Sequence, residues 1–72
     1  MEKVRLTDAL AYLKKKAGID FERKTFIRYL ESGEIRVDGK PVKLIARKIE
    51  DRWFVDRSSL DDLIAVINSQ HS

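Results

Sequence analysis

The stretch from Asp20 to Gly33 constrains the fold of this chain more than any other part of it. Read as a helix, it places Phe26, Ile27 and Leu30 on one side of a 3.6-residue period and polar side chains on the other. Asp20 is a suitable N-cap, and Gly33 is a suitable residue to follow the last turn. The sequence therefore predicts a short amphipathic helix over residues 20–32, with one buried stripe and one polar face.

The polar face of this predicted helix offers hydroxyl, basic and aromatic groups. A helix that reads the major groove of DNA needs an apolar back that anchors it and hydrogen-bond donors at its front. An ordinary amphipathic helix with a solvated face would show the same pattern, so other segments must decide between the two interpretations. The residues expected to contact DNA from this helix are Arg23, Lys24, Thr25, Arg28, Tyr29 and Ser32.

A second helix is predicted ahead of this one. Thr7 is a natural N-cap for a helix that continues to about Ala17, and Gly18 follows as a stop. The lysines at 14–16 lie in its last turn, where cations complement the helix dipole, although they could also contact phosphate. Because the connection at Gly18–Ile19 is short, we expect an angled pair of helices, the helix-turn-helix pattern.

After Gly33 the apolar period changes from 3.6 to 2, which indicates strands. Asp38-Gly39 is a turn signal, residues 42–49 form a predicted strand, and Glu50-Asp51 joins it to a second strand over residues 52–55. A basic hairpin after a recognition helix is typical of a wing that contacts the phosphate backbone, although a plain ribbon with charged edges is the alternative. The predicted wing residues are Lys40, Lys43, Arg47, Lys48 and Arg52.

The last third of the chain supplies further core residues and a helix. Trp53 and Val55 share a strand parity and are expected to face the core, with Trp53 as an anchor, whereas Phe54 has the opposite parity. Ser58 is the predicted cap of a final helix, with Asp61 at the capping-box position. Its predicted apolar stripe consists of Leu60, Leu63, Ile64 and Ile67, and fraying is expected from Asn68 onward.

Length and composition limit the classes of function. With 72 residues the chain is expected to form one domain over residues 1–68, followed by a disordered tail at 69–72. It has no cysteine, and its one histidine, His71, lies in that tail, so neither a metal site nor a cofactor is expected. No phosphate loop or nucleophile with a partner base is visible, which favours a binding module over an enzyme. The absence of a membrane-spanning stretch or signal peptide favours the cytoplasm.

The charge is distributed unevenly along the chain. All fifteen basic residues and ten of the twelve acidic residues lie within residues 1–57, whereas residues 58–72 contain Asp61 and Asp62 and no basic residue. A basic body with an acidic last segment is typical of a protein whose first part meets a polyanion.

Three segments together resemble the excisionase family of small winged-helix proteins, which is related to the MerR-type DNA-binding domain. They are LTDALAYL (6–13), KTFIRYLESGEI (24–35) and RWFVDRSSLDDLI (52–64). They follow one another in the family's order, so the resemblance extends over nearly the whole chain. The resemblance implies a small α+β winged helix-turn-helix, with two short N-terminal helices, a β-hairpin wing and a C-terminal helix. It places Thr25 and Arg28 in the recognition helix and Trp53 and Leu60 in the core.

The same resemblance implies a function. The chain would bind double-stranded DNA as an architectural recombination directionality factor or a small transcriptional regulator of a mobile element, associated with the nucleoid. Its partners would be DNA, an integrase or recombinase, and further copies of itself bound cooperatively. A second segment, LESGEIRVDGKPV (30–42), is similar to the S4 RNA-binding module, so RNA binding is one alternative. A protein-interaction domain is another.

Overall fold

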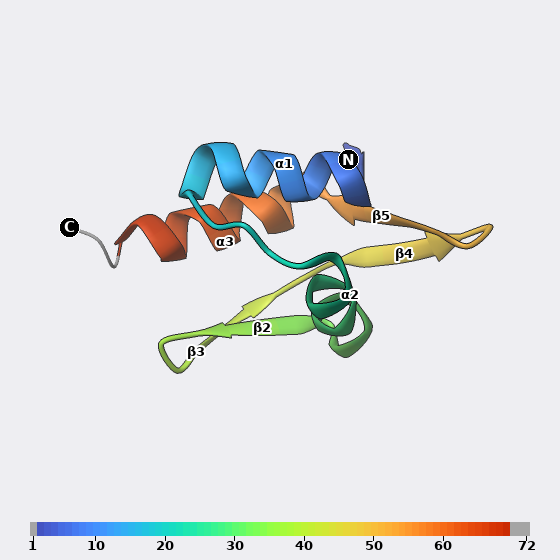
Figure 1. Ribbon diagram of the computed structural model, residues 1–72. Helices are drawn as coiled ribbons and strands as arrows, with labels where there is room; N and C mark the ends of the chain where they lie inside the picture. The colour runs from blue at the N-terminus through green and yellow to red at the C-terminus, as the bar shows by residue number, and fades with distance from the viewer. Residues whose placement is uncertain (1, 70–72) are drawn as a thin grey trace.

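The computed structural model describes residues 2–69 and confirms the predicted α+β class. Helices and short antiparallel strands follow one another along the chain (Figure 1). In order, the elements are β1 (Lys3–Arg5), α1 (Leu6–Ala17), α2 (Arg23–Ser32), β2 (Glu34–Val37), β3 (Lys40–Lys43), β4 (Ala46–Ile49), β5 (Arg52–Asp56) and α3 (Arg57–Ser69).

Helix α1 starts two residues before the position that the sequence suggested. Arg5 occupies the N-cap in an extended conformation and makes no side-chain capping bond, so the prediction of Thr7 as the cap is wrong. The reason is the strand before it: Arg5 pairs with Phe54, and the helix begins where that pairing stops. The predicted C-terminus is correct, since Gly18 adopts the left-handed conformation (φ 70°) and donates its N–H to the Lys14 carbonyl at 3.0 Å.

Helix α2 starts later than predicted. Its N-cap is Glu22, whose carbonyl accepts the Phe26 N–H at 2.9 Å, so the prediction of Asp20 as the cap is wrong. The prediction of a tight turn at Gly18–Ile19 is also wrong, because residues 18–22 form an extended connection between α1 and α2 (Figure 1). Phe21 holds this connection on the core, with its ring centroid 5.3 Å from that of Phe26.

The strands form two separate antiparallel sheets. Strands β2 and β3 make a two-stranded hairpin, and the other three make a sheet in the order β1-β5-β4. The predicted single strand over residues 42–49 is therefore wrong, since it breaks at Leu44 and Ile45. The Leu44 N–H donates to the Gly33 carbonyl beside the first sheet, and the Ile45 carbonyl accepts the Asp56 N–H beside the second, each at 2.8 Å.

Both hairpin turns use backbone conformations with positive φ. Asp38 and Gly39 have φ values of 48° and 81°, and Glu50 and Asp51 have 50° and 64°. Two successive residues with positive φ are typical of the tight turn that matches the twist of a hairpin. The two turn signals in the sequence are thus confirmed, although the second turn uses residues that adopt this conformation at some cost.

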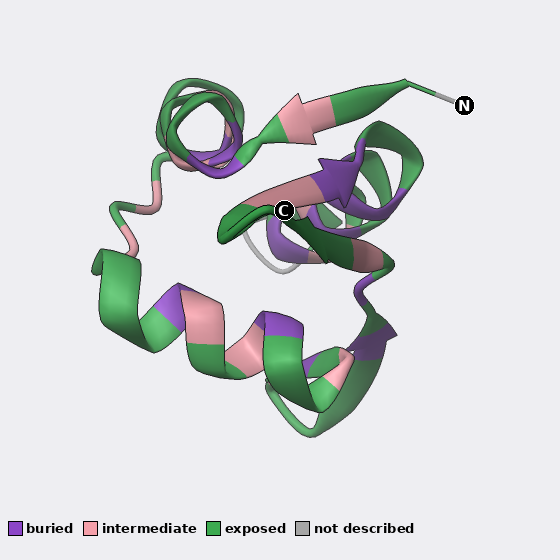
Figure 2. Ribbon diagram, turned by 90° about the vertical axis from the view of Figure 1, so that its right-hand side faces the viewer, coloured by how far each residue is buried: buried purple, intermediate pink, exposed green. Residues whose placement is uncertain are grey.

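The core lies where α1, α2 and α3 meet the inner faces of the strands (Figure 2). Phe26, Leu13, Leu60, Leu63 and Val55 are the largest fully buried side chains. Trp53 faces the core as its parity predicted and packs against it, although it is half-buried and not fully buried. Phe26 on α2 is the largest of the fully buried side chains.

Helix α3 begins directly at the end of β5. Asp56, not Ser58, supplies the cap, since its Oδ1 accepts the Ser58 N–H at 3.3 Å. Asp61 accepts the Tyr12 hydroxyl at 2.7 Å, which joins α3 to α1. Helix α3 continues to Ser69, and the rest of the segment predicted to fray, with His71, lies outside the described residues.

Candidate nucleic-acid interface

Helix α2 has two different faces in the folded chain. Phe26 and Leu30 are buried, at 0% and 5% exposure. The predicted contact residues Arg23, Lys24, Thr25, Arg28 and Ser32 are all exposed. Because Thr25, Arg28 and Ser32 follow one another at helical spacing, α2 presents a continuous polar stripe of donors to a ligand.

Tyr29 is placed differently from the other predicted contact residues of α2. It is half-buried, packs against the core, and meets the Phe21 ring edge-on at a centroid distance of 6.3 Å. Its ring therefore helps to hold the connection before α2, and it is the least available of the six.

The predicted wing residues are divided between two hairpins. Lys40 and Lys43 are exposed on the β2–β3 hairpin, whereas Arg47, Lys48 and Arg52 are exposed on the β4–β5 hairpin. The tips of the two hairpins point to opposite ends of the molecule (Figure 1). The prediction of one continuous wing is therefore wrong. Of the five predicted wing residues, Arg52 on the β4–β5 hairpin is the one that lies beside the start of α2.

A hollow lies where the β4–β5 hairpin meets the starts of α1 and α2. Three arginines from three different elements line it: Arg5 at the end of β1, Arg23 at the start of α2, and Arg52 at the start of β5. Thr7, Leu6, Asp51 and Trp53 complete its lining. The structure thus brings together one predicted residue of the helix and one of the wing.

The electrostatics of this hollow favour an anion. Within residues 2–69, none of the three arginines has an acidic group within 4.0 Å of its guanidinium nitrogens. Two helices also begin at its edge, and the free N–H groups of a helix start attract negative charge. With three arginines against the one carboxylate of Asp51, the hollow carries a net positive charge, which suits an oxyanion such as a phosphate group.

Sequence reasoning missed Arg5 and Thr7. Lys3 and Arg5 alternate with Val4, a period-2 signal for a strand that exposes two cations. That signal could have identified Arg5 as an exposed basic residue. Its proximity to Arg52 depends on the pairing of β1 with β5, which is distant in sequence.

A polar network on α1 and α3 occupies another part of the surface. Arg57 donates to Glu2 at 2.7 Å and lies over the Tyr12 ring, 5.6 Å from its centroid. The hydrogen bond to Glu2 raises the pKa of Arg57 above its ordinary value. Since its charge is already paired, Arg57 is a structural link rather than a member of the interface.

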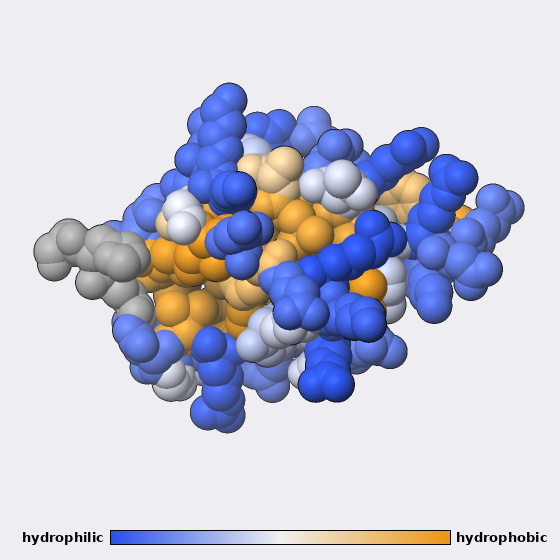
Figure 3. Space-filling view, in the orientation of Figure 1, coloured by the Kyte–Doolittle hydropathy of each residue, from blue (hydrophilic) through white to orange (hydrophobic). Residues whose placement is uncertain are grey.

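The space-filling view shows hydrophilic side chains around the edge of one face and an apolar region in its middle (Figure 3). The described residues contain no group of three or more His, Cys, Asp or Glu side chains placed to hold a metal ion. Nor does any helix among them have the length and apolarity needed to cross a membrane.

We found no match to the chain among protein-family models, curated proteins or solved structures.

Proposed function

We propose that the chain is a sequence-specific double-stranded DNA-binding protein of the winged helix-turn-helix type, and not an enzyme. In this proposal, α2 is the recognition helix and the β4–β5 hairpin is the wing. The observation that carries it is the hollow in which Arg23 of α2 and Arg52 of the wing meet Arg5, since it gives helix and wing one common site for a phosphate group.

In this proposal, the exposed side chains of α2 recognise the base sequence of the DNA. Arg28 can pair with the acceptors of guanine in the major groove, and Thr25 and Ser32 can contact either bases or phosphates. The arginines of the hollow and of the wing carry no base information, because phosphates are the same at every step; they fix the position of α2 on the duplex. With base contacts made by α2 and phosphate contacts made by the arginines, even a small domain can bind a specific sequence.

The resemblance to excisionases supports a more particular role. We propose that the protein acts as a recombination directionality factor beside an integrase, or as a small transcriptional regulator of a mobile element. Both roles need a small DNA-binding protein without catalytic groups, and both place it with the nucleoid in the cytoplasm.

RNA binding is the second candidate, because the segment similar to the S4 module folds as the end of α2 followed by a separate hairpin. Strands β2 and β3 pair around the Asp38-Gly39 turn, directly after α2. Lys40 and Lys43 lie on this hairpin, away from the arginine hollow.

Titration of labelled duplex DNA and of labelled hairpin RNA at two salt concentrations separates these candidates. We expect tighter binding to the duplex and a steep decrease of affinity with salt, since several phosphate contacts release counterions. The matched pair Arg23→Ala and Lys40→Ala removes one charge from each side of the molecule. Loss of duplex affinity with Arg23→Ala alone supports the proposal; preference for RNA, with the larger loss in Lys40→Ala, would reverse it.

A further inference from the structure

The three-stranded sheet has an outer face that faces away from the core. Val4, Val55 and Ala46 stand opposite one another on adjacent strands, and Val55 is fully buried. The neighbouring row therefore points the other way. It consists of Arg5 on β1, Phe54 on β5 and Arg47 on β4.

Phe54 is exceptional among the aromatic side chains of residues 2–69. The other five pack in or against the hydrophobic core, whereas Phe54 does not. It is half-buried, and the register places one arginine on each side of it. An aromatic ring between two exposed guanidinium groups is an arrangement that binds bases and phosphates together.

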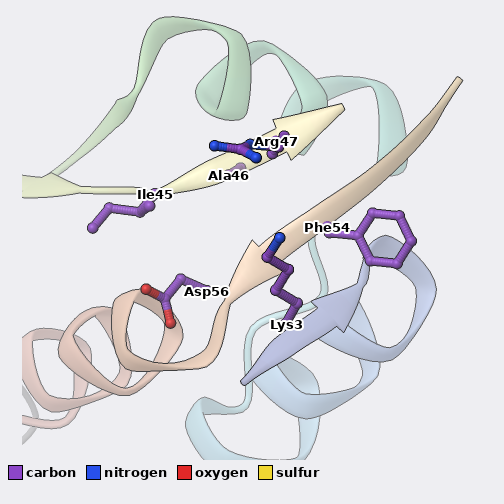
Figure 4. Close-up of a pocket in the computed structure, with 6 residues that line it drawn as sticks. All are labelled: Lys3, Ile45, Ala46, Arg47, Phe54 and Asp56. Carbon is purple, nitrogen blue, oxygen red and sulfur yellow. The ribbon is translucent and has the colours of Figure 1, made fainter. Parts of the chain in front are cut away.

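A hollow of about 180 Å³ lies beside Phe54 on this face (Figure 4). Its walls are Lys3, Ile45, Ala46, Arg47, Phe54 and Asp56, and Ile45 is one of the two large exposed hydrophobic side chains of the described residues. The hollow is smaller than the roughly 300–1,000 Å³ of ordinary small-molecule pockets. It has room for one part of a longer ligand, such as a single ring.

The charge of this face selects a polyanion. Lys3, Arg5 and Arg47 are exposed. Asp56 is the one acid in the hollow and is 6% exposed. Its Oδ1 accepts the Ser58 N–H, whereas its buried Oδ2 has no hydrogen-bond partner among the described residues, so three exposed cations stand against one buried carboxylate. An aromatic surface for a base, surrounded by cations for phosphates, matches the chemistry of an unpaired nucleotide, because the bases of a duplex have no free face to offer.

We propose that the outer face of the β1-β5-β4 sheet binds single-stranded nucleic acid, with one base stacked on Phe54 and adjacent phosphates held by Lys3, Arg5 and Arg47. This surface is separate from the polar stripe of α2, but it shares Arg5 with the arginine hollow and Arg47 with the proposed wing. The inference rests on Phe54 and the hollow beside it, not on the duplex-binding proposal. Stacking on an aromatic ring accepts every base, so the binding is expected to be tolerant of sequence.

The test measures fluorescence anisotropy of labelled oligothymidylate and oligouridylate, each of about 12 nucleotides, with the wild type and Phe54→Leu. Leucine keeps an apolar side chain and removes the stacking surface. We expect Phe54→Leu to weaken binding of both strands by about 5- to 100-fold, while duplex binding changes less than about twofold. A folded Phe54→Leu protein that binds both strands as tightly as the wild type would overturn the proposal.

Two lysine variants test the phosphate contacts of the sheet independently of Phe54. Lys3→Ala removes an exposed cation from the sheet, and Lys15→Ala removes one from α1 as a matched control. We expect Lys3→Ala alone to lower the salt slope of strand binding by about 0.7, the effect of one phosphate contact, and an unchanged slope would count against the proposal even if Phe54→Leu does not fold. The ratio of the wild-type affinities for oligothymidylate and oligouridylate then shows whether the face prefers DNA or RNA.

Discussion

The hydroxyl group of Ser59 on α3 forms a hydrogen bond with the crossover, the segment that connects the two sheets between β3 and β4. Ser59 is 2% exposed, and its Oγ accepts the Ile45 N–H at 2.9 Å. Ile45 lies between β3 and β4, where its N–H belongs to neither ladder. The side chain of one residue thus satisfies a backbone donor that the change of sheet leaves without a strand partner.

We expect Ser59→Ala to destabilise the protein by about 1–3 kcal/mol, because the Ile45 N–H then stays unsatisfied in a partly buried place. Urea denaturation followed by circular dichroism measures this loss. The neighbouring Ser58→Ala is the matched control, since Ser58 is exposed and its side chain should contribute less than about 0.5 kcal/mol. Equal stability of the two variants would show that the hydroxyl of Ser59 is not needed at the crossover.

Arg28 lies at the middle of the exposed stripe of α2, opposite the buried Phe26 and Leu30. If it pairs with guanine, Arg28→Ala should cost about 1–3 kcal/mol of binding to the preferred duplex and relax selection at one base pair. Selection of binding sites from a random duplex library, with the wild type and the variant, measures both effects. Because the side chain is exposed, the melting temperature should stay nearly the same. Identical selected sites and affinities would exclude Arg28 from base reading.

At the scale of elements, the Glu50-Asp51 turn is a weak point of the proposed wing. Both residues have positive φ, which costs about 1–2 kcal/mol per ordinary residue but little for asparagine or glycine. We expect the double change Glu50→Asn with Asp51→Gly to raise the stability by about 1 kcal/mol, measured by thermal unfolding. It also removes two acids from the tip, so duplex affinity should rise. A lower melting temperature would show that the turn is held by contacts of these side chains.

The two hairpins provide a matched comparison of charge. Arg47→Ala with Lys48→Ala removes two cations from the β4–β5 hairpin, and Lys40→Ala with Lys43→Ala removes two from the β2–β3 hairpin. We expect the first pair to weaken binding to all duplex sequences about equally and to lower the salt slope by about 2, since backbone contacts carry no base information. The second pair should change the slope less. The opposite order would place the DNA on the β2–β3 side.

Local signals in the sequence predicted the elements whose causes are local. The stripe of Phe26 and Leu30, the stop at Gly18 and the turn at Asp38-Gly39 each follow from a few adjacent residues. The break at Leu44 has no such signal, because the segment VKLIARKI contains neither glycine nor proline. At this break the chain leaves the β2–β3 sheet, and β4 then pairs with β5, which in turn pairs with β1, about fifty positions earlier in the chain. The same long-range pairing brings Arg5 into the hollow, which explains why the sequence did not reveal it.

For the whole molecule, size sets a limit on what one copy can do on DNA. The longest extent of the chain is 40 Å, which corresponds to about 12 base pairs at about 3.4 Å each. A single module of this kind covers about 600–1,000 Å² of interface, and one short helix reads few base pairs. If the protein acts on DNA as proposed, a unique site on a chromosome would require neighbouring copies or a larger partner bound beside it.

The distribution of charge indicates which surface would meet a neighbour. Helix α3 carries Asp61 and Asp62 and packs beside α1, whereas α2 lies on the other side of the molecule (Figure 1). Since acidic groups repel phosphates, we propose that α3 faces a neighbouring protein and not the DNA. Contacts between adjacent copies would then supply affinity as effective concentration.

We therefore expect footprints on a native site to extend over several closely spaced copies that fill cooperatively, with a bend that changes the electrophoretic mobility of the DNA. Asp62→Lys tests the role of α3, because Asp62 is exposed and its replacement leaves the bond between Tyr12 and Asp61 in place. This variant should fill the sites less cooperatively while its affinity for an isolated site is kept or raised. A lone footprint of about half a helical turn on straight DNA, without any effect on a recombinase acting at the same site, would exclude the directionality role and leave a simple repressor.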